Sequence, residues 1–303
     1  MKIAVTGASG LIGQALVPAL RADGHEVVRL VRRTPRTADE HRWDPPHRQI
    51  DPAVVRDVDA VVNLAGTPIR PRPFTASYKR DLVASRIDST TTVSEALAAA
   101  QTADPSRPRV LLSASAVGFY GDTGDRVVEE DAPPGKDFLA RLCVQWEDAT
   151  RPAADAGVRV VTLRTGLVIG RGAMLVRILG SVFRLGLGGR MGSGRQFWPW
   201  VSLADEVGAI RFLLTADDVR GPVNLTGPEP VRNAEFVRDL AAAVSRPAVL
   251  PVPAVALRLA LGEFGRSSVL AGQRAVPARL RSAGYRFAHS DLPSALQEAL
   301  GRA

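Results

Sequence analysis

The chain has 303 residues, of which 46% are hydrophobic, and a mean hydropathy near zero. These values are typical of a globular protein with one large domain or two unequal lobes, and no apolar run reaches the roughly 18 residues that would span a bilayer. The single cysteine, Cys143, excludes an intrachain disulfide. Since no signal-peptide pattern is present, we expect a cytoplasmic protein, and since no spanning segment is present, we expect no membrane partner.

The net charge of +8 comes from 39 basic residues, mostly arginines, that are spread over the whole chain. A nucleic-acid-binding module usually gathers its basic residues on one element. We therefore expect no specific nucleic-acid partner, and instead a small-molecule substrate, with a homodimer as one possible assembly. The four histidines form no motif, so we expect no metal site.

The most informative pattern lies in the first 13 residues. A short apolar run at residues 3–5 leads into glycines at positions 7, 10 and 13, and apolar residues at helical spacing follow. A strand, a glycine turn and a helix N-terminus in this order form a phosphate site, because backbone N–H groups and the positive end of the helix dipole converge there. The pattern predicts a dinucleotide site formed by Gly7, Ser9, Gly10, Leu11, Ile12 and Gly13.

The segments that follow alternate between strand and helix patterns. Strands are predicted at residues 26–31, 59–66, 109–115 and 158–164, with helices at 77–100 and 138–156. This alternation predicts an α/β fold, a Rossmann-type doubly wound parallel sheet with right-handed crossovers.

Beyond Gly166 the alternation stops. Residues 170–200 are glycine-rich and predicted to be irregular, whereas a helix at 203–216 and a strand at 222–225 return to the sheet. We expect a nucleotide-binding domain of residues 1–169 plus 201–227. The remaining residues, 170–200 plus 228–303, should form a smaller, mostly helical lobe over the carboxyl edge of the sheet, where ligands of such folds bind.

Several segments together resemble the extended short-chain dehydrogenase/reductase superfamily, in its NAD-dependent epimerase/dehydratase group. They are residues 6–13, 63–66, 113–115, 118–121 and 164–170. A subfamily labelled either sugar-nucleotide epimerase or cell-division inhibitor is similar at further positions, namely 43–45, 85–86, 146–147, 199–201 and, in its C-terminal segment of unknown function, 270–280 and 283–287. The similarity covers essentially the whole chain and implies a nicotinamide cofactor, but no particular substrate.

The residues after the second strand indicate which cofactor. An NAD-specific site usually has an acidic residue there, but this chain has Arg32 and Arg33, and no carboxylate before Asp39. An arginine fork suits the 2′-phosphate of NADP, so we expect NADP(H). The alternative is that both arginines are only solvated charges.

The resemblance also implies further cofactor contacts. It places Leu64 and Ala65, in one turn with Gly66, near the adenosine ribose. It makes Arg86 a candidate for the cofactor phosphates, with Asp81, earlier on the same helix, as a ribose or orienting partner. The alternatives are an ordinary turn for the first group and solvated charges for the second.

The catalytic pair that the family usually has is absent. Its Tyr-x-x-x-Lys motif falls on Leu139 and Cys143, so the usual acid–base group is missing. Ser115 keeps the serine position, and Tyr120 is a nearby phenol that could replace the tyrosine, or could instead pack or line the site. A lone cysteine among apolar residues is more often a small buried hydrophobe than a nucleophile.

A polar and aromatic cluster near residue 200 is the candidate for substrate contact. Arg195, Trp198 and Trp200 could form a pocket wall, or the two tryptophans could hold the lobes together. The sequence favours an enzyme, an NADP(H)-dependent oxidoreductase or epimerase acting on a small polar, sugar-like molecule. The alternative is a regulatory or scaffold protein that binds NADPH without turnover.

Overall fold

An eight-stranded sheet forms the centre of the computed structural model, which describes residues 1–301. From edge to edge the strands follow the order β12, β8, β6, β5, β1, β2, β3, β4, all paired in parallel except β3 with β4. Their bounds are β1 (Lys2–Thr6), β2 (Glu26–Val31), β3 (Glu40–Asp44), β4 (Gln49–Ile50), β5 (Ala60–Asn63), β6 (Val110–Ala116), β8 (Arg159–Thr165) and β12 (Gly221–Leu225). The strand order reverses between β1 and β5, which is where doubly wound sheets open a ligand crevice. The predicted fold class is confirmed.

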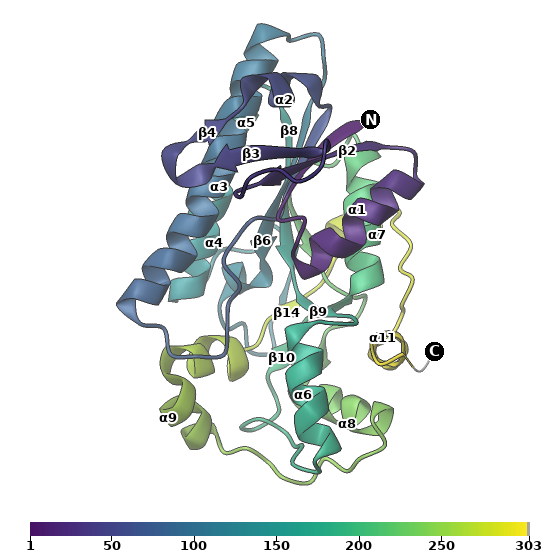
Figure 1. The fold of residues 1–303 in the computed structure, drawn as a ribbon. Helices are drawn as coiled ribbons and strands as arrows, with labels where there is room; N and C mark the ends of the chain where they lie inside the picture. Colours follow the sequence, from purple (N-terminus) through teal and green to yellow (C-terminus); the bar gives the residue numbers. More distant parts are fainter. Residues whose placement is uncertain (302–303) are drawn as a thin grey trace.

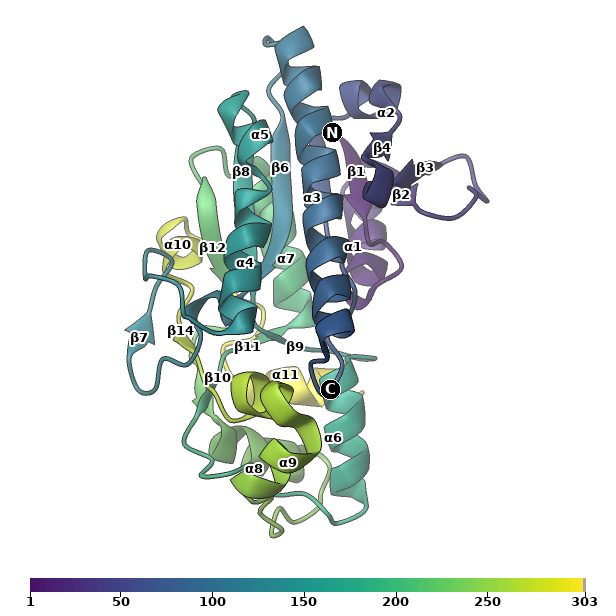
Figure 2. The same ribbon diagram turned by 90° about the vertical axis from the view of Figure 1, so that its left-hand side faces the viewer.

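Helices cover both faces of the sheet (Figures 1 and 2). One face carries α1 (Leu11–Ala22) and α7 (Leu203–Thr215), and the other carries α2 (Pro52–Asp57), α3 (Ala76–Ala103), α4 (Phe138–Asp148) and α5 (Arg151–Asp155). Because both faces are buried, the strands are nearly continuous apolar runs rather than alternating ones.

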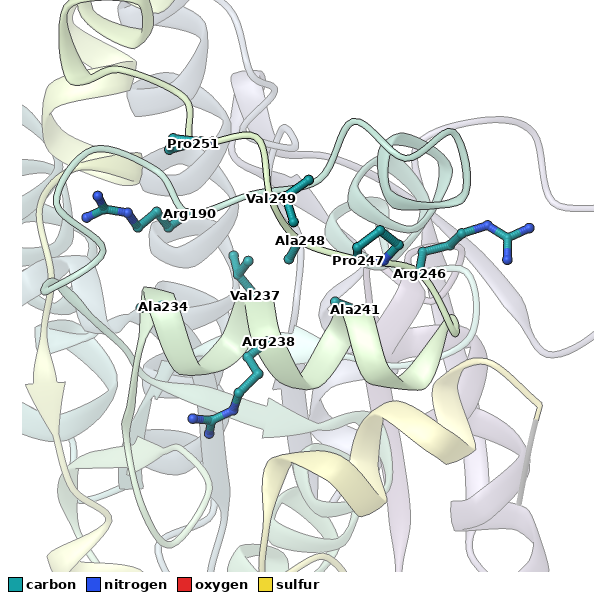
Figure 3. A pocket seen from close by; sticks show the side chains of 10 residues that line it. All are labelled: Arg190, Ala234, Val237, Arg238, Ala241, Arg246, Pro247, Ala248, Val249 and Pro251. Carbon is teal, nitrogen blue, oxygen red and sulfur yellow. The ribbon is translucent and has the colours of Figure 1, made fainter.

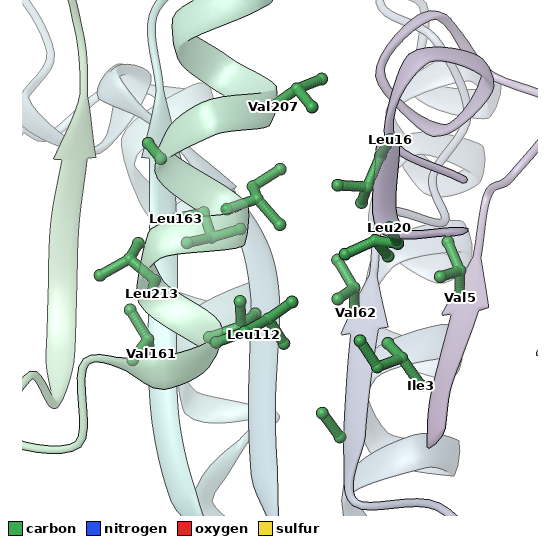
Figure 4. Packing of buried hydrophobic residues seen from close by; sticks show 14 of the residues in the cluster. Ile3, Val5, Leu16, Leu20, Val62, Leu112, Val161, Leu163, Val207 and Leu213 are labelled. Carbon is green, nitrogen blue, oxygen red and sulfur yellow. The ribbon is translucent and has the colours of Figure 1, made fainter. Parts of the chain in front are cut away.

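The two faces of β1 show how the sheet is packed. Ile3 and Val5 point toward Leu16 and Leu20 of α1 (Figure 4), while Ala4 between them packs on the opposite face. Successive side chains of a strand point to opposite faces. The apolar run therefore supplies both cores and fixes where β1 ends, at the glycine turn.

A smaller helical lobe lies at the carboxyl edge of the sheet, in the lower part of Figure 1. Its core joins residues of α6 (Met174–Arg184), α8 (Asn233–Ala243) and α11 (Leu292–Ala299). The lobe also includes α9 (Ala254–Phe264), whereas α10 (Ala278–Ser282) lies beside β12 and places Leu280 in the core of the main sheet. Three small sheets pair β9 (Leu167–Ile169) with β11 (Trp200–Ser202), β10 (Phe197–Trp198) with β13 (Val231–Arg232), and β7 (Val127–Val128) with β14 (Arg274–Ala275). The predicted division into two domains stays a prediction.

Two local predictions were wrong. The predicted helix at 138–156 is two helices, because Pro152 at the start of α5 has no N–H to continue the hydrogen bonding of α4. Residues 170–200 are not irregular throughout, since α6 lies within them. Val176, Leu179 and Phe183 recur at helical spacing and are buried there, and this pattern outweighs the glycines around them.

Candidate functional site

The glycine turn between β1 and α1 leaves no room for side chains. Gly7 has a φ of +65°, and a Cβ on it would lie 2.6 Å from the carbonyl oxygen of Leu64. A Cβ on Gly13 would lie 2.5 Å from the carbonyl oxygen of Gly7. Gly10 caps α1 without any side-chain hydrogen bond. The first amides of the helix therefore remain available to an anionic ligand, as a phosphate cradle requires.

The loop after β5 is fixed against this turn by the hydroxyl of Thr6. That hydroxyl donates to Oδ1 of Asn63 at 2.6 Å and accepts from the amides of Leu64 at 3.0 Å and Ala65 at 3.1 Å. Both loops therefore line the same end of the sheet. The structure brings the predicted residues Leu64 and Ala65 next to the predicted glycine turn.

At the end of β2, the two arginines differ in what they bind. Arg33 forms a two-pronged contact with Glu40, at 2.7 and 2.6 Å, and these hydrogen bonds lower the pKa of Glu40 to about 2. Asp39 is likewise held, by Arg21 and Arg29. Arg32 is exposed and pairs with nothing in residues 1–301. At the end of β2, this corner therefore offers the free guanidinium of Arg32, while the carboxylates of Asp39 and Glu40 are already paired.

Arg86 lies buried on α3 beside the loop after β5. Its Nη1 donates to the carbonyl oxygens of Thr67 at 3.1 Å and Leu82 at 3.2 Å, and its guanidinium lies 4.9 Å from the ring centre of Trp146. Burial lowers its pKa, and no carboxylate within residues 1–301 forms an ion pair with it. A buried cation without a counter-charge is costly, so this position suits an anionic ligand group.

The other predicted cofactor residues are more exposed. Ser9, Gly10 and Gly66 lie on the surface of the two loops, where a ligand could reach them. Asp81 is exposed on α3 and has no partner among the described residues, so the structure does not join it to Arg86. The ribose role of Asp81 stays a prediction.

Ser115 lies at the carboxyl end of β6 and belongs to a buried polar array. Its hydroxyl donates to Oε1 of Glu147 at 2.6 Å. Arg164 holds both oxygens of that carboxylate, with Nε on Oε1 and Nη2 on Oε2, each at 2.8 Å. Sequence reasoning missed the role of Glu147. The pair at 146–147 marked the resemblance to the subfamily, but nothing in the sequence joins positions 115 and 147.

Tyr120 belongs to the same array but lies deeper. Its phenol donates to Oδ1 of Asn224 at 2.7 Å and accepts from Nη1 of Arg164 at 3.0 Å. The side chain is buried, and burial raises its pKa, which disfavours the ionised phenol that an acid–base role needs. Its catalytic role stays a prediction, and this geometry favours the packing alternative.

Both positions of the missing family motif lie on α4 and carry apolar side chains, Leu139 half-buried and Cys143 buried. Cys143 packs against Val117, Phe119 and Tyr120, and burial raises the pKa of its thiol to about 12. Since the thiolate is the nucleophilic form, this cysteine behaves as a small buried hydrophobe.

The three predicted substrate residues do not share one surface. The side chain of Arg195 is 77% exposed and lies 4.0 Å from Asp125. Trp198 and Trp200 are buried in the core of the helical lobe, where Trp198 packs edge-on against Phe236. Their substrate contacts stay a prediction. The packing role accounts for both indoles.

A closed glycine turn at the switch point of a doubly wound sheet defines a Rossmann-type dinucleotide-binding protein. Residues 3–226 match the family model described as the NAD dependent epimerase/dehydratase family, and residues 252–299 match a domain of unknown function, DUF1731. The chain belongs to the NAD dependent epimerase/dehydratase family.

Similar proteins cover the whole chain. Epimerase family protein Mb2239 of Mycobacterium bovis is 48% identical over 300 residues, which is 99% of this chain and 98% of that protein. The crystal structure of human epimerase family protein SDR39U1 (isoform 2) with NADPH is 32% identical, with a TM-score of 0.87 and 100% of both chains covered. A nucleoside-diphosphate sugar epimerase from Corynebacterium glutamicum is 33% identical, with a TM-score of 0.82, over 99% of this chain and 58% of that one. The cofactor of the human protein agrees with the NADP(H) predicted from the sequence.

Proposed function

We propose that this protein is an NADP(H)-dependent oxidoreductase or epimerase whose substrate oxygen is bound by Ser115. The observation that carries the proposal is the hydrogen bond from Ser115 to Glu147, 2.6 Å long, at the same edge of the sheet as the glycine turn. A single strand, β5, separates β6 from β1, so the two sites lie about 10 Å apart across the sheet. A dinucleotide spans that distance.

The residues present fit the cofactor. The cradle at Gly7 and Gly13 would be filled by any Cβ, and the first amides of α1 would receive the diphosphate. Arg32 would take the 2′-phosphate, and the buried Arg86 would meet a phosphate or another anionic group of a bound ligand. When bound, the cofactor supplies hydride transfer at the nicotinamide ring.

The hydrogen-bond direction at Ser115 determines what this residue does. Its proton points to Glu147, so its lone pairs are free to accept from a substrate hydroxyl. As an alcohol is oxidised, the substrate proton moves to Oγ of Ser115 while the serine proton moves to Oε1 of Glu147. Reduction reverses both transfers. The pair therefore takes over the proton exchange expected of the family's usual tyrosine and lysine, which this chain lacks, while Arg164 holds the carboxylate in place.

The substrate class that we propose is a nucleoside-diphosphate sugar or a similar polar, sugar-like molecule. The support is the C. glutamicum relative, whose name states such a substrate. The buried Arg86 adds a cation suited to a phosphate group.

The test measures NADPH oxidation and NADP⁺ reduction at 340 nm with a panel of nucleotide sugars and simple carbonyl compounds. Glu147→Gln keeps the shape of the side chain but cannot accept the proton. We expect it to lower turnover by about 10²- to 10⁴-fold, which is the usual contribution of a general acid–base group. Ser115→Ala should fall in the same range, and Ser181→Ala on the exposed surface of α6 is the matched control.

NADPH binding, followed by tryptophan fluorescence, separates lost folding from lost chemistry. Both site variants should bind the cofactor as the parent does. Turnover that is unchanged in Glu147→Gln would contradict the proton path. The absence of any turnover across the panel would contradict the enzymatic function itself.

A second candidate is a regulatory protein that binds NADPH without turnover. The observation that favours it is the apolar environment of Cys143, at the position where the resemblance implies the usual family lysine. This reading predicts that NADPH changes the affinity of the chain for a protein partner. Pull-downs that give the same partners with and without NADPH would count against it.

A further inference from the structure

The exposed apolar side chains of this protein gather at one end of the molecule. Among the described residues, eleven large apolar side chains are exposed, and nine of them lie within residues 174–187 and 249–259. Both segments belong to the part of the helical lobe that lies farthest down in Figures 1 and 2. Contiguous exposed apolar surface of this kind usually marks an interaction site.

Helix α6 carries the first part of this surface. Its buried face holds Val176, Leu179 and Phe183, as expected of a helix packed on a core. The opposite face is also apolar, with Met174, Ile178 and Val182 spaced four residues apart and each exposed. A helix that is apolar on both faces is normally covered on both. Nothing in residues 1–301 covers the outer face of α6.

The surface continues from α6 onto the loops at the end of the lobe. Leu185 is 74% exposed and Leu187 is 54% exposed. The next residue, Gly188, accepts a backbone hydrogen bond of 3.1 Å from Leu250, which is itself exposed beside Val249. The amide of Val252 bonds to the carbonyl oxygen of Arg190 at 2.9 Å. Residues 188–190 and 250–252 therefore run side by side and connect the two segments. We call the nine exposed apolar side chains of these segments the distal apolar surface.

An open groove borders this surface between α8 and residues 246–251 (Figure 3). It encloses about 480 Å³, and Val237, Ala241 and Ala248 form its apolar wall. The guanidinium groups of Arg190 and Arg246 extend away from that wall in Figure 3. Apolar side chains are thus bordered by arginines whose charges reach outward.

The charge around the distal apolar surface has one sign. Residues 170–204 and 244–262 contain seven arginines and none of the 31 acidic residues of the chain, and only Arg195 among them lies within 4.0 Å of a carboxylate, that of Asp125, among the described ion pairs. The acidic residues of the adjoining helix α8 are engaged, Asp239 with Arg238 and Glu235 with the amide of Arg232. Glu263, which follows the second segment, pairs with Lys79 of α3. No free carboxylate of these elements offsets the arginines.

We propose that the distal apolar surface binds the surface of an anionic lipid membrane. Exposed apolar side chains in segments that also carry arginines are the combination that interfacial helices use, with the apolar face entering the headgroup region and the cations meeting lipid phosphates. No helix within residues 1–301 is long and apolar enough to cross a membrane, but binding at the surface requires none. The sequence analysis expected no membrane partner because no spanning segment is present, and that criterion does not address surface binding.

A second copy of the chain fits this surface less well. In a twofold contact the same patch meets itself, so a patch that carries arginines at 177 and 184 would meet a patch with the same charges. The two segments supply no carboxylate to pair with them. An anionic bilayer supplies both the negative charge and the apolar phase.

The test is co-flotation of the full chain with vesicles of phosphatidylglycerol and phosphatidylcholine, compared with vesicles of phosphatidylcholine alone. We expect binding to the anionic vesicles only. Binding should decrease as the salt concentration rises from about 50 to about 500 mM, because salt shortens the Debye length and screens the arginines. Leu185→Asp combined with Leu187→Asp should weaken partitioning at least tenfold. Val127→Asp, at an exposed apolar residue outside both segments, is the matched control and should bind like the parent.

A second variant keeps the test valid if the first one does not fold. Arg177→Gln combined with Arg184→Gln removes exposed charge only and should lower binding to anionic vesicles without changing the urea midpoint. The proposal is overturned if the parent chain does not bind, if it binds both vesicle types equally, or if the leucine variant and the Val127 control bind alike. It is also overturned if light scattering finds a dimer that the leucine variant dissociates, because a second copy then covers the surface.

Discussion

Replacing Arg32 should weaken the binding of NADPH much more than that of NADH. Arg32 is exposed and unpaired within residues 1–301, so its guanidinium can meet the 2′-phosphate without first breaking another contact. A hydrogen bond to a charged group contributes about 1.5–3 kcal/mol. Each 1.4 kcal/mol or so corresponds to a factor of ten. Arg32→Ala should therefore raise the Kd for NADPH about ten- to a hundredfold and leave that for NADH unchanged.

The neighbouring arginine should behave differently, because it already has a partner. In Arg33→Ala, Glu40 loses its two-pronged contact and keeps only the amide of Arg36 at 2.7 Å and Nη2 of Arg29 at 3.3 Å. Its pKa should then rise toward the ordinary value, but the group remains ionised at neutral pH. The released negative charge should repel the 2′-phosphate, so Arg33→Ala should weaken NADPH binding. Adding Glu40→Gln removes this charge and should recover part of the lost NADPH affinity.

The assay is titration of the four proteins with NADPH and NADH, followed by the fluorescence of the intrinsic tryptophans or by calorimetry. The reasoning is refuted if Arg32→Ala leaves the NADPH to NADH ratio unchanged. It is also refuted at the second arginine if Arg33→Ala combined with Glu40→Gln binds NADPH no better than Arg33→Ala alone.

Four further predictions follow from buried groups. Gly13→Ala places a Cβ 2.5 Å from a carbonyl oxygen, so the turn must shift. We expect the free energy of unfolding, measured in urea, to fall by about 1–3 kcal/mol, with a large loss of NADPH affinity. An unaffected affinity would show that the cradle is not the binding site. Burial raises the pKa of Glu206 from 4.5 to about 8. Between those two pH values Glu206 keeps its proton in the folded state and loses it in the unfolded state. As pH rises through this range, the group should therefore lower the free energy of unfolding by about 1.4 kcal/mol per pH unit. Glu206→Gln should remove this contribution to the slope, and equal slopes in parent and variant would contradict the raised pKa. Cys143 should resist iodoacetamide in the native protein and react in urea, so rapid native labelling would place the thiol at the surface. Tyr120→Phe should cost about 1–3 kcal/mol of stability by leaving buried partners unsatisfied, with unchanged NADPH binding, whereas lost turnover at full stability would restore its catalytic role.

Features that depend on neighbouring residues could be predicted from the sequence. The glycine turn and the first helix follow from a few adjacent positions, because a strand, a tight turn and a helix start each have a local pattern. The predicted strand at 26–31 matches β2 at both ends, because the turn at Gly24 precedes it and Arg32 follows it. Strand β3, which lies between β2 and the edge strand β4, was not predicted. Its sequence, Glu-His-Arg-Trp-Asp, contains mostly charged residues, and the buried carboxylate of Glu40 is paired with Arg29 and Arg33, two residues that the sequence does not connect to it.

Features that depend on distant residues could not be predicted. Ser115 and Glu147 are 32 positions apart and meet only because α4 packs beside β6. Tyr120 is buried, and its phenol donates a hydrogen bond to Asn224, which is 104 positions away. The two indoles near residue 200 look like a pocket wall in the sequence, yet the helices of the lobe enclose them. In each case the partner comes from another part of the chain, where spacing carries no information.

A crystal structure of the chain grown with NADPH tests the central claim most directly. We expect the diphosphate within hydrogen-bonding distance of the amides of Leu11 and Ile12, and the 2′-phosphate beside Arg32. NADPH bound elsewhere, or a glycine turn filled by the protein's own side chains with saturating cofactor present, would contradict this account.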